Sequence, residues 1–534
     1  MKPLQLLDES SAEVLALGWL VKAVAPVSPY GERCFEELRA FRPGEEAAAQ
    51  SRADLIAEVA QSFDAGVLDA IARALASAPD AAGAIARASL GEHLSDASFF
   101  ELRAFCETVD RIDELSAGQS TLEKLSNEAV RALRDSLATG QQGRSEFYLA
   151  DAFDAELAAA RTRLARAQAE LDALRGLERE RAARELGRDE LGGDEFIVMR
   201  AELGGALPEG IRIVREAPTY FLCTLDYGET GLAALERRDA AAAAVADAEE
   251  CVRQTLSAFV QRNARGFLDV ANAVGQRDIV VAAARFAQRY ACHPASVSDE
   301  PVVAFEQARF LPLESELASV GRQFMPLDLE LDDAAVLTGP NMGGKSVCLL
   351  TCGFVALCAA FGLPVPAARA RIALFDQIGW LGLGREAHVG GLLSSFAQEV
   401  LILKEILLRN AGRLLILVDE FARTTTPHEG KALCVALLAR LRERHACAIL
   451  ATHLEGLAAA AGVRHFAVRG LRGIPEPSPT NDVREVLAAL AASMDYEVAE
   501  VSGEDSGRGD AIALAALLGI DSRFVESAYR ALTQ

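Results

Sequence analysis

Apolar side chains recur every three or four residues through the first 150 residues of the chain. Val14, Leu17, Leu20 and Val21 form one such group, and similar groups follow along this part of the sequence. That spacing gathers apolar side chains on one face of an α-helix. We therefore predict a helical core over residues 1–150.

From residue 151 the apolar spacing alternates regularly by three and four, which is the heptad pattern of a coiled coil. The residues that follow it are Leu157, Ala160, Leu164, Ala167, Leu171 and Leu174. Within about 195–226 the pattern changes to short β-strand runs separated by Gly and Pro, and a helical pattern then returns. Residues 151–290 are thus predicted to be a coiled-coil lever with a small β-tip. An alternative is a spacer with no binding role.

Residues 300–534 have a different organisation, in which buried strands alternate with helices. Continuous apolar runs occupy 334–337 and 414–418, and a further strand is predicted at 448–453. Alternation of this kind predicts a mostly parallel sheet, with ligand chemistry at the carboxyl ends of its strands. The last forty residues are predicted to be helical again.

The first of these strands leads into a phosphate-binding pattern, Gly-x-x-x-x-Gly-Lys-Ser. Its residues are Gly339, Pro340, Asn341, Met342, Gly343, Gly344, Lys345 and Ser346. A strand before and a helix after the loop would turn backbone N–H groups toward phosphate oxygens. Lys345 would reach the β- and γ-phosphates of ATP, and Ser346 would hold Mg²⁺. The alternative is a glycine-rich turn with a nearby lysine.

Two later strands end in residues suited to nucleotide hydrolysis. Asp419 and Glu420 follow the strand at 414–418, and His453 ends the predicted strand at 448–453. Asp419 can orient Mg²⁺ through its water shell, and Glu420 can polarise the attacking water. His453 could contact the γ-phosphate, although a histidine at the end of a strand is otherwise an ordinary surface residue. These three residues are our catalytic and metal candidates beside Lys345 and Ser346.

Ser394 and Ser395 stand at the start of a predicted helix, after two glycines. A helix N-terminus with serine hydroxyls is a second anion site, although such a pair is usually only a helix cap. Their position between the P-loop and Asp419 is the one at which ABC-type ATPases carry the segment that closes over the other subunit's nucleotide.

Several segments together resemble the ATPase domain of the MutS family. Residues 338–346 are similar to the family's TGPNM(G/A)GKS loop, 394–399 to its STFxxE segment, 419–426 to DExGRGTS and 451–453 to ATH. Residues 509–519 resemble the helical segment that pairs two ATPase domains. The specific match covers about residues 320–530, and the lever before it matches in layout more than in motif.

The resemblance implies a multidomain α plus α/β protein: a helical core, a lever with a β-tip, and an ABC-type P-loop ATPase domain with C-terminal dimerisation helices. It implies a homodimeric conformational switch that binds and hydrolyses ATP with Mg²⁺. Within one subunit, ATP would be handled by the P-loop residues and by Asp419, Glu420 and His453. Ser394 and Ser395 would reach the ATP of the partner subunit.

The chain also departs from the family's pattern. Helical core sequence begins almost at Met1, which leaves no room for the family's N-terminal mismatch reader, and Ala422 and Thr424 stand where the family usually has glycines. Two hypotheses follow. One is a DNA-binding, mismatch-repair-related ATPase without the reader. The other is a protein-remodelling ATPase similar to the reactivating factor of B12-dependent lysine 5,6-aminomutase.

Charge makes DNA the less favoured partner. The formal net charge is −23, and the tip, counted from Asp194 to Asp226, carries three arginines against six acidic residues. Phosphate contacts need cations or N–H donors, so a tip of this charge is poorly suited to bind DNA. Ten cysteines without a Cys-x-x-Cys pair, together with the lack of a signal sequence or a long apolar span, predict a cytoplasmic protein with no membrane contact.

Overall fold

The computed structural model describes residues 6–117, 122–139, 147–203, 207–340, 344–382, 395–408, 412–471, 494–501, 512, 515–516 and 520–532. The chain folds into two compact units. The first comprises Met1–Ser77, Ile112–Lys124 and Asn272–Gln534, and the second comprises Ala78–Arg111 and Leu125–Ala271. Two helices, α7 (Asp96–Leu115) and α11 (Ala264–Tyr290), contribute residues to both units.

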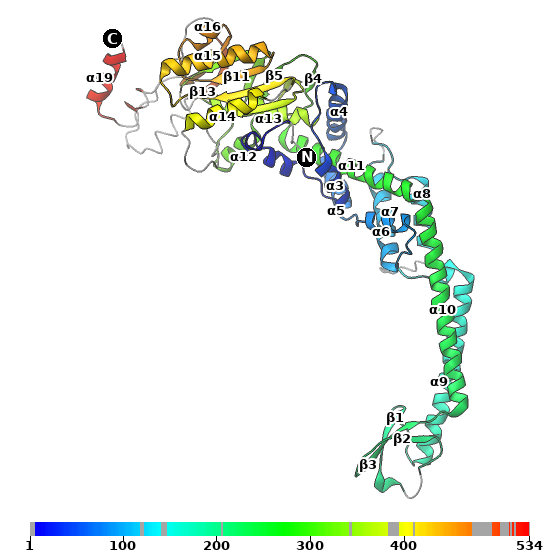
Figure 1. Ribbon diagram of the computed structural model, residues 1–534. Coiled ribbons are helices and arrows are strands. Elements are labelled where there is room, and N and C mark those ends of the chain that lie inside the picture. Colours follow the sequence, from blue (N-terminus) through cyan, green and yellow to red (C-terminus); the bar gives the residue numbers. More distant parts are fainter. Residues whose placement is uncertain are drawn as a thin grey trace. The chain divides into compact units, whose positions relative to one another are not determined.

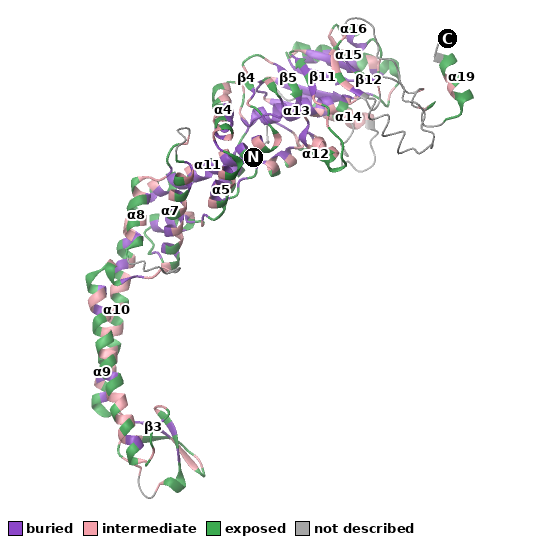
Figure 2. Ribbon diagram, turned by 180° about the vertical axis from the view of Figure 1, so that it is seen from behind, coloured by how far each residue is buried: buried purple, intermediate pink, exposed green. Residues whose placement is uncertain are grey.

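Two long helices dominate the second unit. They are α9 (Ala155–Glu185) and α10 (Gly228–Arg262), which pack side by side along their length (Figure 1). Their unit also contains α6 (Ala82–Ser89), α8 (Glu128–Ala138) and the short 3-10 helices η1 (Asp151–Phe153) and η2 (Arg200–Glu202). The pair buries only a narrow seam, as Figure 2 shows, because solvent surrounds it on most sides.

The seam follows the heptad positions in α9. Leu157, Ala160 and Leu171 are buried, and Leu164 and Leu174 are half-buried. An ion pair of 2.8 Å between Arg161 and Glu249 joins the two helices beside the seam.

A three-stranded antiparallel sheet in the order β1-β3-β2 connects α9 to α10. Its strands are β1 (Glu195–Met199), β2 (Ile211–Glu216) and β3 (Tyr220–Leu225). Side chains alternate between the two sides of a strand. One side, with Phe196, Val198 and Cys223, packs on Ala182 and Ala183 at the end of α9.

The first unit is built on a six-stranded sheet in the order β13-β12-β7-β11-β10-β9. Its strands are β7 (Ala334–Thr338), β9 (Gln377–Leu381), β10 (Leu414–Asp419), β11 (Cys447–Ala451), β12 (Arg464–Leu471) and β13 (Met494–Glu500). All pairings are parallel except that of β13 with β12. A second, four-stranded sheet, which the sequence pattern did not predict, has the order β4-β8-β5-β6. Its strands are β4 (Ser296–Ser298), β5 (Val303–Ala308), β6 (Leu327–Leu331) and β8 (Arg369–Ala373).

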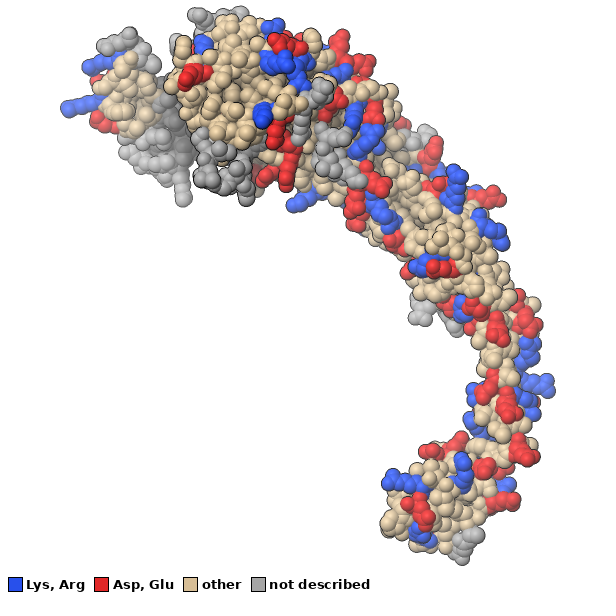
Figure 3. Space-filling model, in the orientation of Figure 1, with Lys and Arg blue, Asp and Glu red and all other residues tan. Residues whose placement is uncertain are grey.

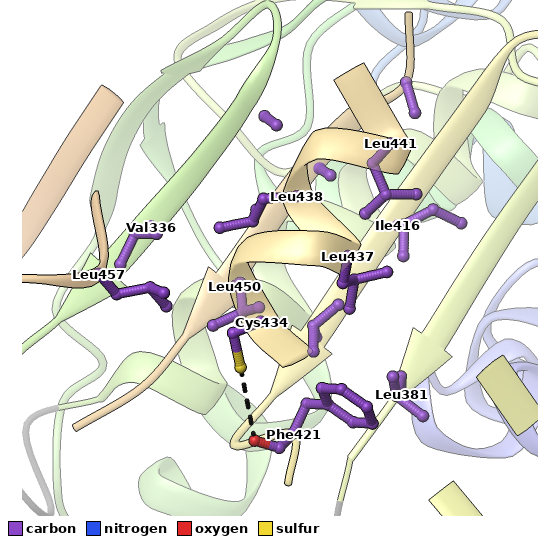
Figure 4. Close-up of a cluster of buried hydrophobic side chains, with 14 of the residues drawn as sticks. Val336, Leu381, Ile416, Phe421, Cys434, Leu437, Leu438, Leu441, Leu450 and Leu457 are labelled. Atoms are coloured by element: carbon purple, nitrogen blue, oxygen red, sulfur yellow. Dashed lines mark hydrogen bonds between the residues drawn. The ribbon is translucent and has the colours of Figure 1, made fainter. Parts of the chain in front are cut away.

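The first unit also contains helices outside the two sheets. They are α1 (Glu9–Val14), α2 (Leu17–Ala23), α3 (Pro29–Glu37), α4 (Glu46–Ser62), α5 (Ala65–Ala76), α12 (Leu311–Ser319), α13 (Lys345–Ala360), α14 (Ser395–Leu408), α15 (Pro427–Glu443), α16 (Leu457–Ala461) and α19 (Ser522–Leu532). Adjacent residues of β10 face opposite sides of the sheet. Leu417 lies against Gly353 of α13, whereas Ile416 belongs to a cluster with Leu437 and Leu441 of α15 (Figure 4). Each fully buried leucine of this kind contributes about 1.5–3 kcal/mol to stability.

The coarse fold prediction, a chain that combines helical and mixed α/β parts, is confirmed. The strand predicted at 448–453 is shorter at its end than expected, since β11 stops at Ala451. The segment at 509–519 lies largely outside the described residues. Among the helices that the structure describes, none is both long and apolar enough to cross a membrane.

The start of α3 packs closely against α11 in the first unit. The buried carboxylate of Asp278 on α11 accepts hydrogen bonds from the backbone N–H groups of Val27, at 3.0 Å, and Ser28, at 2.6 Å. Gly31 of α3 lies directly beside it. A Cβ atom at Gly31 would stand 2.3 Å from the Asp278 Oδ2 atom, too close for any real contact.

We therefore expect Gly31→Ala to destabilise the first unit by about 2 kcal/mol, the usual range for overpacking a tight interior. The comparison is Gly18→Ala in α2, where nothing lies within 4 Å of the added Cβ. Calorimetric melting of the full chain measures both variants. Equal melting temperatures for Gly31→Ala and the unsubstituted protein would contradict the packing described here.

Candidate nucleotide site

The candidate site lies where three neighbouring parallel strands end. In the sheet, β11 stands between β7 and β10, and the register pairs Ala451 with both Leu337 and Asp419. The next residues therefore leave the sheet at one edge. Two backbone hydrogen bonds hold them there, from Glu420 N–H to the Ala451 carbonyl at 3.0 Å and from Thr452 N–H to the Leu337 carbonyl at 3.0 Å.

Glycine is required at both ends of the loop after β7. Gly339 has φ of +147° and Gly344 has φ of +87°, values that favour glycine. A Cβ atom on Gly339 would lie 3.0 Å from the Val468 Cβ atom, and one on Gly344 would lie 3.0 Å from the ring of Tyr496. The left-handed Gly344 directly precedes α13. The free N–H groups at the start of this helix are suited to an anion.

Lys345, the first residue of α13, points back across the loop. Its Nζ atom donates hydrogen bonds to the carbonyl oxygens of Gly339, at 2.9 Å, and Pro340, at 3.1 Å. The same atom lies 3.2 Å from Nε2 of His453. Only 6% of Lys345 is exposed, and this burial lowers the pKa of its ammonium group, while Glu420 and Asp419 act in the opposite direction. A phosphate would be a stronger partner for this cation than two neutral carbonyls.

Ser346 and Asp419 form a pair of oxygen donors. The Ser346 hydroxyl donates a hydrogen bond of 2.7 Å to Oδ2 of Asp419. The pKa of Asp419 is raised, because the effect of burial exceeds that of the hydrogen bond from Ser346, which lowers it. Hydroxyl and carboxylate oxygens are ligands that Mg²⁺ accepts, with phosphate oxygens and water completing its octahedron. The described residues contain no cluster of three His, Cys, Asp or Glu side chains that could hold a metal. Two protein oxygens of this kind suit an ion that also binds phosphate oxygens and water.

Glu420 is held on both sides by cationic or hydrogen-bonding groups. One carboxylate oxygen lies 2.7 Å from Nε2 of His453, and the other lies 3.1 Å from the guanidinium of Arg423. The backbone of Glu420 is itself unusual, with φ of +54°. A half-buried carboxylate next to a phosphate site can accept a proton from water.

The structure brings most of the predicted site residues together. These are Gly339, Pro340, Gly344, Lys345, Ser346, Asp419, Glu420 and His453. Asn341, Met342, Gly343 and Ser394 lie outside the described residues, and of Ser395 only its position as the first residue of α14 is described. Whether these residues perform the assigned roles stays a prediction.

Sequence reasoning did not assign roles to three residues near the site, namely Arg423, Glu399 and Tyr496. Arg423 stands three residues after Glu420, a spacing at which a salt bridge could have been expected. Nothing in the sequence links Glu399 to the loop after Glu420. In the structure the Glu399 carboxylate accepts a hydrogen bond from the backbone N–H of Ala422. Tyr496 comes from β13, far along the chain, so only the folded structure shows its proximity to Gly344.

Comparison with known proteins identifies the region around this site. Residues 335–474 match the family model of MutS domain V. An endonuclease MutS2 from Carboxydothermus hydrogenoformans is 34% identical over 218 residues, which are 40% of this chain and 27% of that protein. An endonuclease MutS2 from Clostridium botulinum strain Loch Maree is 30% identical over 274 residues, 48% of this chain and 34% of that protein. The matched part thus spans about a third or less of the length of these relatives.

Proposed function

We propose that this chain, which belongs to the MutS family, binds ATP and hydrolyses it with the help of Mg²⁺. The observation that carries the proposal is the meeting of two short contacts at one sheet edge. Ser346 and Asp419 are 2.7 Å apart, and Glu420 and His453 are also 2.7 Å apart. Phosphate release from MgATP by the full chain tests the proposal, and no release at any protein concentration would refute it.

Each residue has a distinct part in the proposed reaction. Lys345 and the N-terminus of α13 bind the β- and γ-phosphates, and Ser346 and Asp419 hold Mg²⁺. When bound, Mg²⁺ neutralises charge that develops on the phosphate oxygens. Glu420 accepts the proton of the attacking water, and His453 orients the Glu420 carboxylate and responds to the γ-phosphate.

We further propose a homodimeric switch. Residues 300–534 would form an ABC-type P-loop ATPase domain with C-terminal dimerisation helices, and Ser394 and Ser395 would reach the ATP of the partner subunit. Residues 1–150 would form a helical core, and residues 151–290 the coiled-coil lever with its tip. In this arrangement ATP turnover in the paired domains moves the lever.

The client of the switch is DNA or a protein, and the tip carries the relevant observations. One of its three arginines, Arg200, already pairs with Glu216. Arg188, which precedes the tip, pairs with Glu202 at 2.8 Å. Acidic and basic side chains alternate along α9, α10 and the tip on the side shown in Figure 3. Among the described residues of the tip, Arg212 and Arg215 are therefore the arginines left for phosphate contacts.

A protein client is favoured by the side of the tip sheet that faces away from α9. Ile197 and Met199 are 47% and 48% exposed there. They alternate with the buried residues of β1, so they share the solvent side of the sheet. Exposed apolar groups suit a protein surface better than a phosphate backbone. Reactivation of a B12-dependent aminomutase of the lysine 5,6-aminomutase type is one function of this class.

We expect the full chain to bind neither duplex, mismatched nor branched DNA at about 50 mM salt, where phosphate contacts are strongest. Fluorescence anisotropy with labelled DNA of each type, with and without ATP, measures this. Binding that weakens steeply as salt increases would instead support the DNA-binding function. Loss of that DNA binding in Arg212→Glu, but not in Arg163→Glu on α9, would place the contact at the tip.

A further inference from the structure

The loop that follows the proposed base has a strained backbone. Glu420 has φ of +54° and Ala422 has φ of +60°, and neither residue is glycine. A left-handed conformation costs an ordinary L-residue about 1–2 kcal/mol. Two such residues in a stretch of three persist only where neighbouring groups hold them.

Helix α14 supplies one of the groups that hold this loop. The carboxylate of Glu399 accepts a hydrogen bond of 2.9 Å from the backbone N–H of Ala422. Glu399 is half-buried. Its pKa is raised, because the effect of burial exceeds that of the hydrogen bond from Ala422, which lowers it. One turn earlier, the ring of Phe396 lies 6.4 Å from the ring of Phe421, measured between centroids. The loop is thus held by α14 at two consecutive residues.

A third contact comes from α15 on the other side of the loop. The Cys434 thiol lies 3.8 Å from the carbonyl oxygen of Phe421, as the dashed line in Figure 4 shows. The Phe421 side chain points into the cluster between α15 and the sheet, beside Leu381 and Leu437 (Figure 4). Burial anchors Phe421. At Ala422 the backbone N–H is bound by Glu399, and the backbone carbonyl accepts a hydrogen bond of 3.3 Å from the Thr425 N–H.

We propose that Glu399 is a positioning residue for Glu420, acting through the Ala422 N–H and not through contact with the nucleotide. The inference rests on the proposed ATPase function. Ala422 stands between Glu420 and Arg423, whose guanidinium lies 3.1 Å from the Glu420 carboxylate. Without the Glu399 acceptor, Ala422 can relax to negative φ, which turns both Glu420 and Arg423 away from the site.

The position of Glu399 on α14 gives its hydrogen bond with Ala422 a second consequence. Glu399 lies one helical turn after Ser395, which begins α14. A rigid helix carries a displacement of its first turn to the next turn. Contact of the α14 N-terminus with the partner subunit's ATP would therefore shift the Glu399 carboxylate and, through Ala422, the Glu420 loop.

Three substitutions of Glu399 distinguish a requirement for an acceptor at this distance from a requirement for a negative charge. Glu399→Gln keeps an acceptor oxygen at the same distance, and we expect turnover within about 2-fold of the unsubstituted chain, since a neutral acceptor still serves an N–H donor. Glu399→Asp keeps the charge but is one methylene too short, and Glu399→Ala removes the acceptor. We expect both to lower kcat by about 10- to 100-fold, the scale expected for a misplaced catalytic group, with ATP affinity nearly unchanged.

Ala422→Gly supplies an independent test. Glycine adopts positive φ without strain, so the loop needs less support in this background. We expect Glu399→Ala to lower kcat several-fold less when combined with Ala422→Gly than when made alone. Steady-state phosphate release and equilibrium binding of a fluorescent ATP analogue measure these effects on the full chain.

The outcomes distinguish this inference from the proposed function itself. An unsubstituted chain that releases no phosphate refutes the ATPase function. An active chain in which Glu399→Asp works better than Glu399→Gln, or in which Ala422→Gly gives no recovery, refutes the positioning role alone. The comparison of Gln with Asp stands even if Glu399→Ala does not fold.

Discussion

Glu420→Gln is expected to abolish steady-state ATP turnover and to leave ATP binding intact. The glutamine amide keeps the shape of the side chain and can still contact His453 and Arg423, but it cannot accept a proton from water. Removal of a general base lowers rates by about 10²- to 10⁴-fold. Phosphate release and binding of a fluorescent ATP analogue, measured on the same preparation, provide the two quantities.

The matched control is Glu443→Gln near the end of α15. Glu443 is exposed and pairs with Arg440 of the same helix, at 2.7 Å. The same chemical change there should leave turnover as it is. Normal turnover in Glu420→Gln would remove Glu420 from the role of base.

Lys345→Ala should lose tight ATP binding. The buried Nζ atom is the described cation that lies closest to the loop carbonyls, within 3.1 Å of two of them. A hydrogen bond to a charged group contributes about 1.5–3 kcal/mol, which corresponds to an affinity loss of roughly 10- to 150-fold. Titration of the fluorescent ATP analogue measures the loss.

Lys22→Ala on the exposed side of α2 is the control for loss of one positive charge. Its affinity for ATP should equal that of the unsubstituted chain. If Lys345→Ala also binds with unchanged affinity, the loop at 339–346 is not a P-loop.

The strands beneath the site could be predicted because they are fully buried. A parallel strand covered on both sides is a continuous apolar run, and β7, β10 and β11 each show one. Their order along the chain also placed Lys345, Asp419 and His453 after strand ends. The sequence therefore contained both the local structure and the side chains of the candidate site.

The remaining features depend on contacts between residues that are distant in sequence. The four-stranded sheet was missed because β5 alternates irregularly and its partners β6 and β8 come later in the chain. The Glu399 contact joins residues 23 positions apart across two elements. Positive φ at Ala422 is also invisible to pattern reasoning, since alanine ordinarily avoids it.

Hydrolysis by two ATPase domains acting together is the central feature of the proposed function. Single-turnover phosphate release from MgATP, measured per chain over a range of protein concentrations, tests it most directly. We expect release that requires Mg²⁺ and that increases per chain until the dimer is fully formed, as judged by sedimentation on the same samples. Tight ATP binding without phosphate release at any concentration, or an equal rate per chain in samples that are monomeric, would contradict the account.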